Sequence, residues 1–293
     1  MKVLVTGAGG QVGSEMLRLA QDDFQVVGFD RHDLDITDAE QVGLRLDECA
    51  PEMLVNCAAY TAVDRAEDEP ATARRVNAEA VGGLGRACHD RGIGLVHLST
   101  DYVFDGTKDG PYVEDDVPNP LNVYGATKLA GEESLRSATD RHLILRVSWV
   151  FGSTGRSFVD TMLRLAGERR EISVVDDQIG TPCPAVEIAS AVRRIAKFGA
   201  TREHAWGTYH FSTKPSLSWC QFARAIVDTG VETGLLATRP AVHAIRSSQW
   251  PTKALRPRNS SLGSARLAET FNLEPPAWEP CLRAYVESLC RRR

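Results

Sequence analysis

Short apolar runs separated by helical patterns make up the first half of the chain. Their apolar residues are contiguous rather than alternating, which is typical of strands in a parallel sheet covered on both faces. The predicted strands are Val3–Val5, Gln25–Phe29, Met53–Asn56, Leu95–Leu98 and Leu143–Val147. Helical patterns lie near Gln11–Gln21, Asp38–Glu48, Pro70–Arg91 and Tyr124–Ser137. This alternation predicts right-handed βαβ units and a doubly wound α/β fold.

Beyond Trp149 the pattern loosens. Helices are predicted at Phe158–Gly167, Ala185–Lys197 and Ser218–Asp228, with a strand at Glu171–Val175. Five prolines from Trp250 onward indicate loops and short helices. We therefore expect residues 1–150 to form the sheet domain and residues 151–293 to form mainly a smaller lobe, with an approximate boundary and segments that can interleave with the sheet.

The composition, 43% hydrophobic and 25% charged, is ordinary for a globular protein. A net charge of -5 gives no general attraction to nucleic acid, and the terminal Arg291–Arg293 run is more typical of a solvated tail. No segment approaches the roughly 20 apolar residues that a membrane helix needs, and the N-terminus enters a strand rather than a signal peptide. The 7 cysteines have neither Cys-x-x-Cys nor zinc spacing. We expect a cytoplasmic protein with no metal site and no nucleic-acid or membrane partner.

Three glycines follow the first predicted strand. Gly7, Gly10 and Gly13 are spaced Gly-x-x-Gly-x-x-Gly and precede a helical pattern. Such a turn lets the backbone approach a pyrophosphate and directs helix N–H groups at it, although any tight strand-to-helix turn could use these residues. Because this turn opens a βαβ unit, the pattern favours dinucleotide binding.

A carboxylate ends the second predicted strand. Asp30 can accept hydrogen bonds from an adenosine ribose, or it can cap a helix or loop. Its charge disfavours the 2′-phosphate of NADP, whereas the adjacent Arg31 can pair with that phosphate. The sequence therefore leaves NAD(H) and NADP(H) both open.

Tyr124 and Lys128 are four residues apart in a predicted helix, so their side chains share one face. Because a nearby ammonium favours the phenolate, we expect Lys128 to lower the pKa of Tyr124 toward the range useful for proton transfer. Thr100 follows the fourth predicted strand, where its hydroxyl would lie near Tyr124, although Ser99-Thr100-Asp101 also suits a strand-end turn. Tyr124, Lys128 and Thr100 are the candidate catalytic residues.

Taken together, these motifs resemble the extended short-chain dehydrogenase/reductase superfamily and, within it, the dTDP-4-dehydrorhamnose reductase family. The likeness covers nearly the whole chain. Besides the glycine turn it includes Tyr60–Glu67, Ser99–Phe104, Leu121–Gly125, Arg146–Val150, Asp177–Gly180 and Arg256–Ser260. The last three segments lie outside the cofactor fingerprint, so they indicate the substrate family rather than the fold. The resemblance implies a Rossmann sheet with a smaller C-terminal substrate-binding lobe.

The resemblance also implies roles for individual residues. Cofactor contacts are implied for Gly10, Gln11, Val12, Asp30, Asp35, Ile36, Ala59, Tyr60, Thr61 and Lys128. Thr100, Asp101 and Trp149 would face the sugar nucleotide, and Arg256 would reach its diphosphate. Tyr124 would donate a proton as hydride from NAD(P)H reduces the C4 ketone of dTDP-4-dehydro-β-L-rhamnose to dTDP-β-L-rhamnose. A homodimer is compatible with this family.

Two other functions share much of this motif set. A dTDP-sugar dehydratase or epimerase of the same superfamily is one, but the dehydratases that this chain resembles carry Asp-Glu after the strand threonine. Here Asp101 is followed by Tyr102, which disfavours elimination. The other is a non-catalytic regulatory protein resembling the β subunit of methionine adenosyltransferase, which shares the fold. The complete set of Thr100, Tyr124 and Lys128 fits catalysis better.

Overall fold

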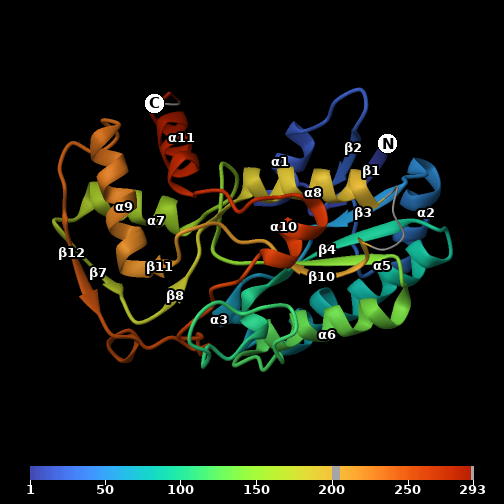
Figure 1. Ribbon diagram of the computed structural model, residues 1–293, viewed down its shortest axis with the longest axis horizontal. Helices are drawn as coiled ribbons and strands as arrows, with labels where there is room; N and C mark the ends of the chain where they lie inside the picture. Colours follow the sequence, from blue (N-terminus) through green and yellow to red (C-terminus); the bar gives the residue numbers. More distant parts are fainter. Residues whose placement is uncertain (200–204, 292–293) are drawn as a thin grey trace.

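A six-stranded parallel sheet forms the centre of the larger of two lobes in the computed structural model, which describes residues 1–199 and 205–291 (Figure 1). The strand order is β10-β5-β4-β3-β1-β2. The strands are β1 (Lys2–Thr6), β2 (Gln25–Phe29), β3 (Met53–Asn56), β4 (Gly94–Thr100), β5 (His142–Val147) and β10 (Gly207–His210). All neighbouring pairs are parallel, which confirms the predicted doubly wound fold.

Helices cover both faces of this sheet. α1 (Gln11–Arg18) and α8 (Ala185–Gly199) contribute to one apolar core, and α2 (Ala39–Cys49), α5 (Ala80–His89) and α6 (Val123–Ala138) contribute to the other. Successive strand residues serve opposite cores: Val3 and Val5 join the first core, while Leu4 joins the second. The apolar runs of the inner strands are contiguous because side chains on both faces of these strands are buried.

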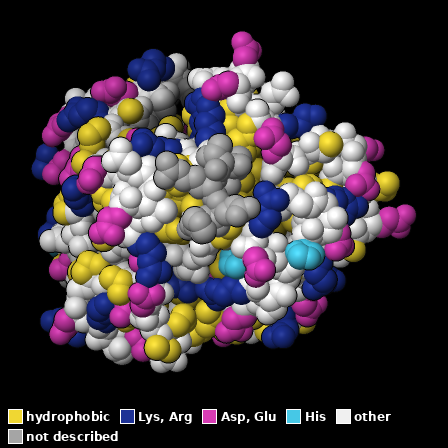
Figure 2. Space-filling view, turned by 45° about the vertical axis from the view of Figure 1, so that its right-hand side comes forward, with side chains coloured by type: hydrophobic (Ala, Val, Ile, Leu, Met, Phe, Trp, Pro, Cys, Tyr) yellow, Lys and Arg dark blue, Asp and Glu magenta, His cyan; other side chains and the backbone are white. Residues whose placement is uncertain are grey.

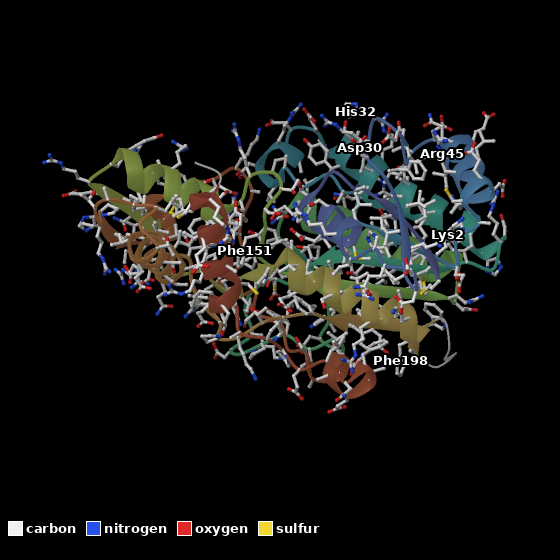
Figure 3. All side chains as sticks on the ribbon, turned by 90° about the horizontal axis from the view of Figure 1, so that it is seen from above. Lys2, Asp30, His32, Arg45, Phe151 and Phe198 are labelled. Atoms are coloured by element: carbon white, nitrogen blue, oxygen red, sulfur yellow. The ribbon has the colours of Figure 1, made fainter. Side chains whose placement is uncertain are left out.

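The smaller lobe has its own core. It contains α7 (Phe158–Glu168), β7 (Glu171–Val175), α9 (Trp219–Glu232), β12 (Ala241–Ile245) and α11 (Glu279–Cys290). β7 and β12 pair in parallel. Phe151 belongs to the core of the smaller lobe and lies between the two lobes in Figure 3.

The chain passes between the two lobes more than once. After the first parts of the smaller lobe it returns as α8 and β10, which complete the sheet lobe. Short strand pairs join the crossing segments: β6 (Val150–Phe151) with β9 (Cys183–Pro184), and β8 (Ile179–Gly180) with β11 (Leu217–Ser218). α10 (Ala265–Phe271) also packs on the sheet lobe. The domain boundary near residue 150 stays a prediction.

The helix predicted over Pro70–Arg91 is interrupted. α4 (Pro70–Arg74) leads into a π-helical segment, η1 (Arg75–Glu79), before α5 begins. Asn77 in this segment is 1% exposed, and its side chain accepts from the backbone N–H of Tyr60 and donates to the carbonyl of Tyr60. Its own carbonyl lies where a Cβ on Gly131 of α6 would collide with it. A tertiary contact therefore accompanies a local geometry that propensity does not predict.

Basic and acidic side chains are interspersed over the face in Figure 2. All seven cysteines lie in the described part of the chain and are free thiols. Within residues 1–199 and 205–291, no helix is both long and apolar enough to span a membrane. Arg292 and Arg293, part of the basic terminal run, lie outside the described residues.

Candidate active site

A pocket of about 1030 Å³ opens at the carboxyl ends of β1 and β3. Here the strand order reverses, since β2 lies on one side of β1 and β3 on the other. Every residue expected to bind the cofactor lines this pocket: Gly7, Gly10, Gln11, Val12, Gly13, Asp30, Arg31, Asp35, Ile36, Ala59, Tyr60, Thr61 and Lys128. Tyr124 lines it as well.

The glycine turn shapes one wall of the pocket. Gly7 has a φ of 68°, and a Cβ on Gly13 would collide with the carbonyl oxygen of Gly7. α1 begins at Gln11 without a side-chain cap at Gly10, so its first N–H groups are available to an anion. The Gln11 Oε1 atom is buried and has no hydrogen-bond partner among the described residues. These features fit a bound dinucleotide.

Asp30 and His32 lie together at one edge of the larger lobe, as Figure 3 shows. The Asp30 carboxylate accepts from the backbone N–H of His32 at 2.7 Å, and this bond lowers the pKa of Asp30. Arg31, His32 and Arg75 also line the pocket. A carboxylate for ribose hydroxyls and two arginines for a phosphate therefore occur together.

Several pocket residues were not singled out from the sequence. They include His32, Thr37, Cys57, Thr72, Arg75, Val147, Gly155 and Arg156. Arg75 sits in the unpredicted π-helical segment, and Arg156 reaches the pocket from the chain after β6. Of these residues, only His32 could have been expected in the pocket from the sequence, because it follows Asp30 and Arg31 directly.

Two close contacts position α6. Asn122 caps the helix by accepting from the Gly125 N–H at 2.8 Å, and a Cβ on Gly125 would collide with the carbonyl of Tyr102. The Tyr124 ring then meets the Tyr102 ring edge-on, with centroids 5.9 Å apart. α6 is thus held close to the end of β4, with the Tyr124 side chain in the pocket wall.

The expected lowering of the Tyr124 pKa is wrong for this structure. Burial raises the pKa of Tyr124 to about 12, and a hydrogen bond with Thr100 offsets only part of this effect. The Lys128 amine donates instead to the carbonyl of Leu98 at 2.7 Å. Tyr124 therefore stays a neutral phenol at physiological pH, which is the form that donates a proton.

Lys128 is itself almost fully buried, at 1% exposed. Its Nζ lies 3.1 Å from Nε2 of His97. Burial lowers the pKa of Lys128 to about 8, while Glu132 and Cys57 act in the opposite direction. Its amine can therefore gain and lose a proton near neutral pH.

Thr100 and Asp101 lie at the end of β4 beside Tyr124. The Thr100 hydroxyl donates to the Asp101 carboxyl at 3.0 Å and accepts from the Tyr102 N–H at 3.2 Å. Burial raises the pKa of Asp101 to about 7, although hydrogen bonds with Ser260 and Thr100 lower it. This carboxyl can donate or accept a hydrogen bond at neutral pH.

The other two expected substrate residues lie further from Tyr124 in the sequence and, like Thr100 and Asp101, outside the pocket lining. Trp149 has a φ of 41° and stacks on Trp219 of α9 with ring centroids 3.4 Å apart. Arg256 forms two hydrogen bonds with Asp64 of α3 (Val63–Ala66), at 3.0 and 2.6 Å. The Arg256 guanidinium is therefore already paired in this state.

The chain is similar to known proteins over almost its entire length. The model for the RmlD substrate binding domain matches residues 1–291. The dTDP-4-dehydrorhamnose reductase of Aggregatibacter actinomycetemcomitans is 42% identical, over 98% of this chain and 99% of that protein. The enzyme of the same name from Escherichia coli K12 is 36% identical, over 99% and 98%.

Solved structures give the same result. A dTDP-4-dehydrorhamnose reductase from Bacillus anthracis in complex with NADP is 35% identical, with a TM-score of 0.90 over 97% of this chain and 98% of that one. A dTDP-4-dehydrorhamnose reductase from Clostridium acetobutylicum is 34% identical, with a TM-score of 0.91 over 99% of this chain and 100% of that one. A UDP-glucose 4-epimerase from Thermotoga maritima is 19% identical with a TM-score of 0.81, a likeness of fold alone.

Proposed function

The chain belongs to the dTDP-4-dehydrorhamnose reductase family, and from this premise we propose that it reduces the C4 ketone of dTDP-4-dehydro-β-L-rhamnose to dTDP-β-L-rhamnose. The observation that carries the proposal is the position of Tyr124. This neutral phenol lies in the wall of a dinucleotide-shaped pocket and contacts Thr100 at the end of β4. NADP(H) or NAD(H) bound in that pocket supplies the hydride.

The chain's own residues control the proton. Tyr124 donates its phenolic proton to the C4 oxygen as negative charge develops there. Thr100 orients that oxygen by turning its hydroxyl proton from Asp101 to the substrate. Lys128, which lines the pocket one helical turn after Tyr124, would bind the cofactor ribose. Asp101 and Trp149 contact the sugar. For Arg256 to bind the diphosphate, it has to exchange its pairing with Asp64 for phosphate oxygens.

The residue that follows Asp101 disfavours elimination chemistry. A dehydratase of the kind that the chain resembles needs a carboxylate there, whereas this chain has Tyr102. Burial raises the pKa of Tyr102 above its ordinary value, so its phenol does not act as a base at neutral pH. The residues at the end of β4 therefore support simple carbonyl reduction.

We also propose a cytoplasmic location. The seven free thiols support it, because disulfides form and persist mainly in oxidising compartments. Assembly into a homodimer stays a prediction.

The decisive experiment is NADPH and NADH oxidation with the 4-keto sugar nucleotide. Replacing the proton donor, Tyr124→Phe, should lower turnover by roughly 10²- to 10⁴-fold while NADPH binding is retained. Tyr209→Phe is the matched control, because this buried tyrosine lies on β10 outside the pocket lining and should keep full activity. Near-normal turnover by Tyr124→Phe would reject the assigned proton donor, and no turnover by the folded wild-type protein would reject the function.

A further inference from the structure

A chain of buried polar side chains lies behind Lys128 and has no role in the reaction as described so far. It crosses the sheet from β1 through β3 and β4 to α6. Thr6 Oγ1 donates to Asn56 Oδ1 at 2.7 Å, Asn56 Nδ2 lies 3.0 Å from His97 Nδ1, and His97 Nε2 lies 3.1 Å from Lys128 Nζ. The four side chains are 0–1% exposed. Every proton in this chain therefore needs a partner inside the protein.

The orientation of the Asn56 amide is determined by the backbone. The N–H of Ala58 donates to Asn56 Oδ1 at 3.1 Å. A backbone N–H can only donate, so the atom that it meets must be the amide oxygen. The Asn56 amide nitrogen, which is also a donor, consequently faces His97.

The tautomer of His97 follows from this orientation. Its Nδ1 meets the Asn56 NH₂ group and must accept. Burial first, then the charges of Lys128 and His142, lower the pKa of His97 far below its ordinary value, so the ring is neutral. A neutral imidazole that accepts at Nδ1 carries its proton on Nε2.

This proton points at Lys128. An ammonium group has three donors and no acceptor, so it would oppose the Nε2–H of His97. An uncharged amine has a lone pair that can accept from Nε2–H, while it still donates to the Leu98 carbonyl at 2.7 Å. The hydrogen-bonded side chains of Thr6, Asn56 and His97 thus favour the uncharged amine of Lys128 by geometry, in addition to any effect of burial.

We propose that His97 is a positioning residue that, held by Asn56, donates its Nε2 proton to the uncharged amine of Lys128. This inference rests on the proposed reductase function and deepens it. Three titratable groups act electrostatically on Lys128 or His97: Cys57 after β3, Glu132 on α6 and His142 on β5. Tyr124, also on α6, lines the same pocket as Lys128. Glu132 is already bound to Arg146 at 2.7 Å, so it does not hold the Lys128 ammonium.

The consequence is a proton supply for Tyr124. After Tyr124 gives its proton to the C4 oxygen, a phenolate remains. Transfer of one proton from the Lys128 ammonium restores the phenol and leaves the amine, which His97 stabilises. The amine then regains a proton from solvent, so one solvent proton is consumed in each reduction.

The first test needs neither cofactor nor sugar. In ¹⁵N NMR of histidine-labelled free protein, the His97 signal, assigned by its loss in His97→Asn, should show a proton on Nε2 and none on Nδ1. Asn56→Asp puts a carboxylate where the NH₂ group was, so it should move the proton to Nδ1. A proton on Nδ1 in the wild-type protein would overturn the proposal.

The second test is a pH profile. Activity should fall as Lys128 loses its proton at pH about 8, and Asn56→Asp should move this alkaline limb upward by about one pH unit because His97 Nε2 then accepts from the ammonium. His97→Asn should shift it in the same direction, which keeps the test open if Asn56→Asp does not fold. His243→Asn, on β12 in the smaller lobe and away from this network, should leave the limb in place.

The same shift is expected in the pH dependence of NADPH affinity, measured by fluorescence without any sugar. If the sugar is not reduced, the proposed function fails, while the tautomer and the NADPH titration still decide the role of His97. An alkaline limb that stays in place in both Asn56→Asp and His97→Asn would reject that role.

Discussion

Two charged side chains one turn apart on α6, Lys128 and Glu132, are both buried but have opposite surroundings. Glu132, 0% exposed, accepts from Arg146 at 2.9 and 2.7 Å, from Arg136 at 2.9 Å and from Ser99 at 2.6 Å. Lys128 has no salt-bridge partner within the described residues and meets a carbonyl and a neutral imidazole. One charge is compensated and the other is not.

The compensated cluster holds the helix in place. Arg146 extends from β5 with its guanidinium 5.1 Å from the centroid of the Phe104 ring and 3.3 Å from His210 Nε2 on β10. Glu132 thereby connects α6 to three strands, β4, β5 and β10. Lys128, without a counter-ion, has a pKa near working pH instead. On this helix, the buried charge that has a counter-ion contributes to stability, whereas the buried charge that has none has a pKa suited to proton transfer.

Removing the uncompensated charge should separate activity from stability. Lys128→Met should lower turnover by about 10²-fold or more, since proton return to Tyr124 is lost. Unfolding in denaturant should show a smaller loss of stability than Glu132→Gln. Removal of an uncompensated buried ammonium offsets part of the cost of leaving the His97 Nε2–H and the Leu98 carbonyl without a partner. Stability that fell as far as in a Glu132 variant would contradict the contrast between the two sites.

Removing the compensating carboxylate should do the opposite. Glu132→Gln leaves Arg146 buried without its anion and should lower the free energy of unfolding by about 3–5 kcal/mol. Glu133→Gln, on the exposed side of the same helix, is the control and should change stability little. Denaturant titrations of the two variants measure the difference, and equal effects would show that the buried cluster does not hold the helix.

The smallest expected effect is on the acid side. Burial would raise the pKa of Glu132, but hydrogen bonds and charge from Arg146 outweigh it and lower the pKa below 4.5. A carboxyl with a lowered folded-state pKa contributes stability that is present above the unfolded value and lost as pH falls through the folded one. The advantage of wild type over Glu132→Gln should therefore shrink below pH 4.5. Melting curves over this range check it; a constant difference would argue against the ion pair as its source.

Much of the molecule was predictable from local sequence. The predicted strands Gln25–Phe29, Met53–Asn56 and Glu171–Val175 coincide with β2, β3 and β7, because short apolar runs bounded by turn residues identify strands. The glycine turn and the Tyr124–Lys128 spacing also follow from local geometry, since a turn and one helical face each involve few neighbouring residues. These features were enough to predict where the pocket opens and residues of its lining.

The tertiary structure decided what depends on residues distant in sequence. β10 joins the sheet although its four residues have no strong apolar pattern, and Asp64 pairs with Arg256 across 192 positions. Burial raises the pKa of Tyr124, although the helical spacing of Tyr124 and Lys128 had predicted a lowered pKa. Likewise, the buried polar network from Thr6 through Asn56 and His97 to Lys128 exists only because β1, β3, β4 and α6 bring their side chains together. Local sequence specifies which groups are present, whereas their partners and dielectric surroundings arise from packing.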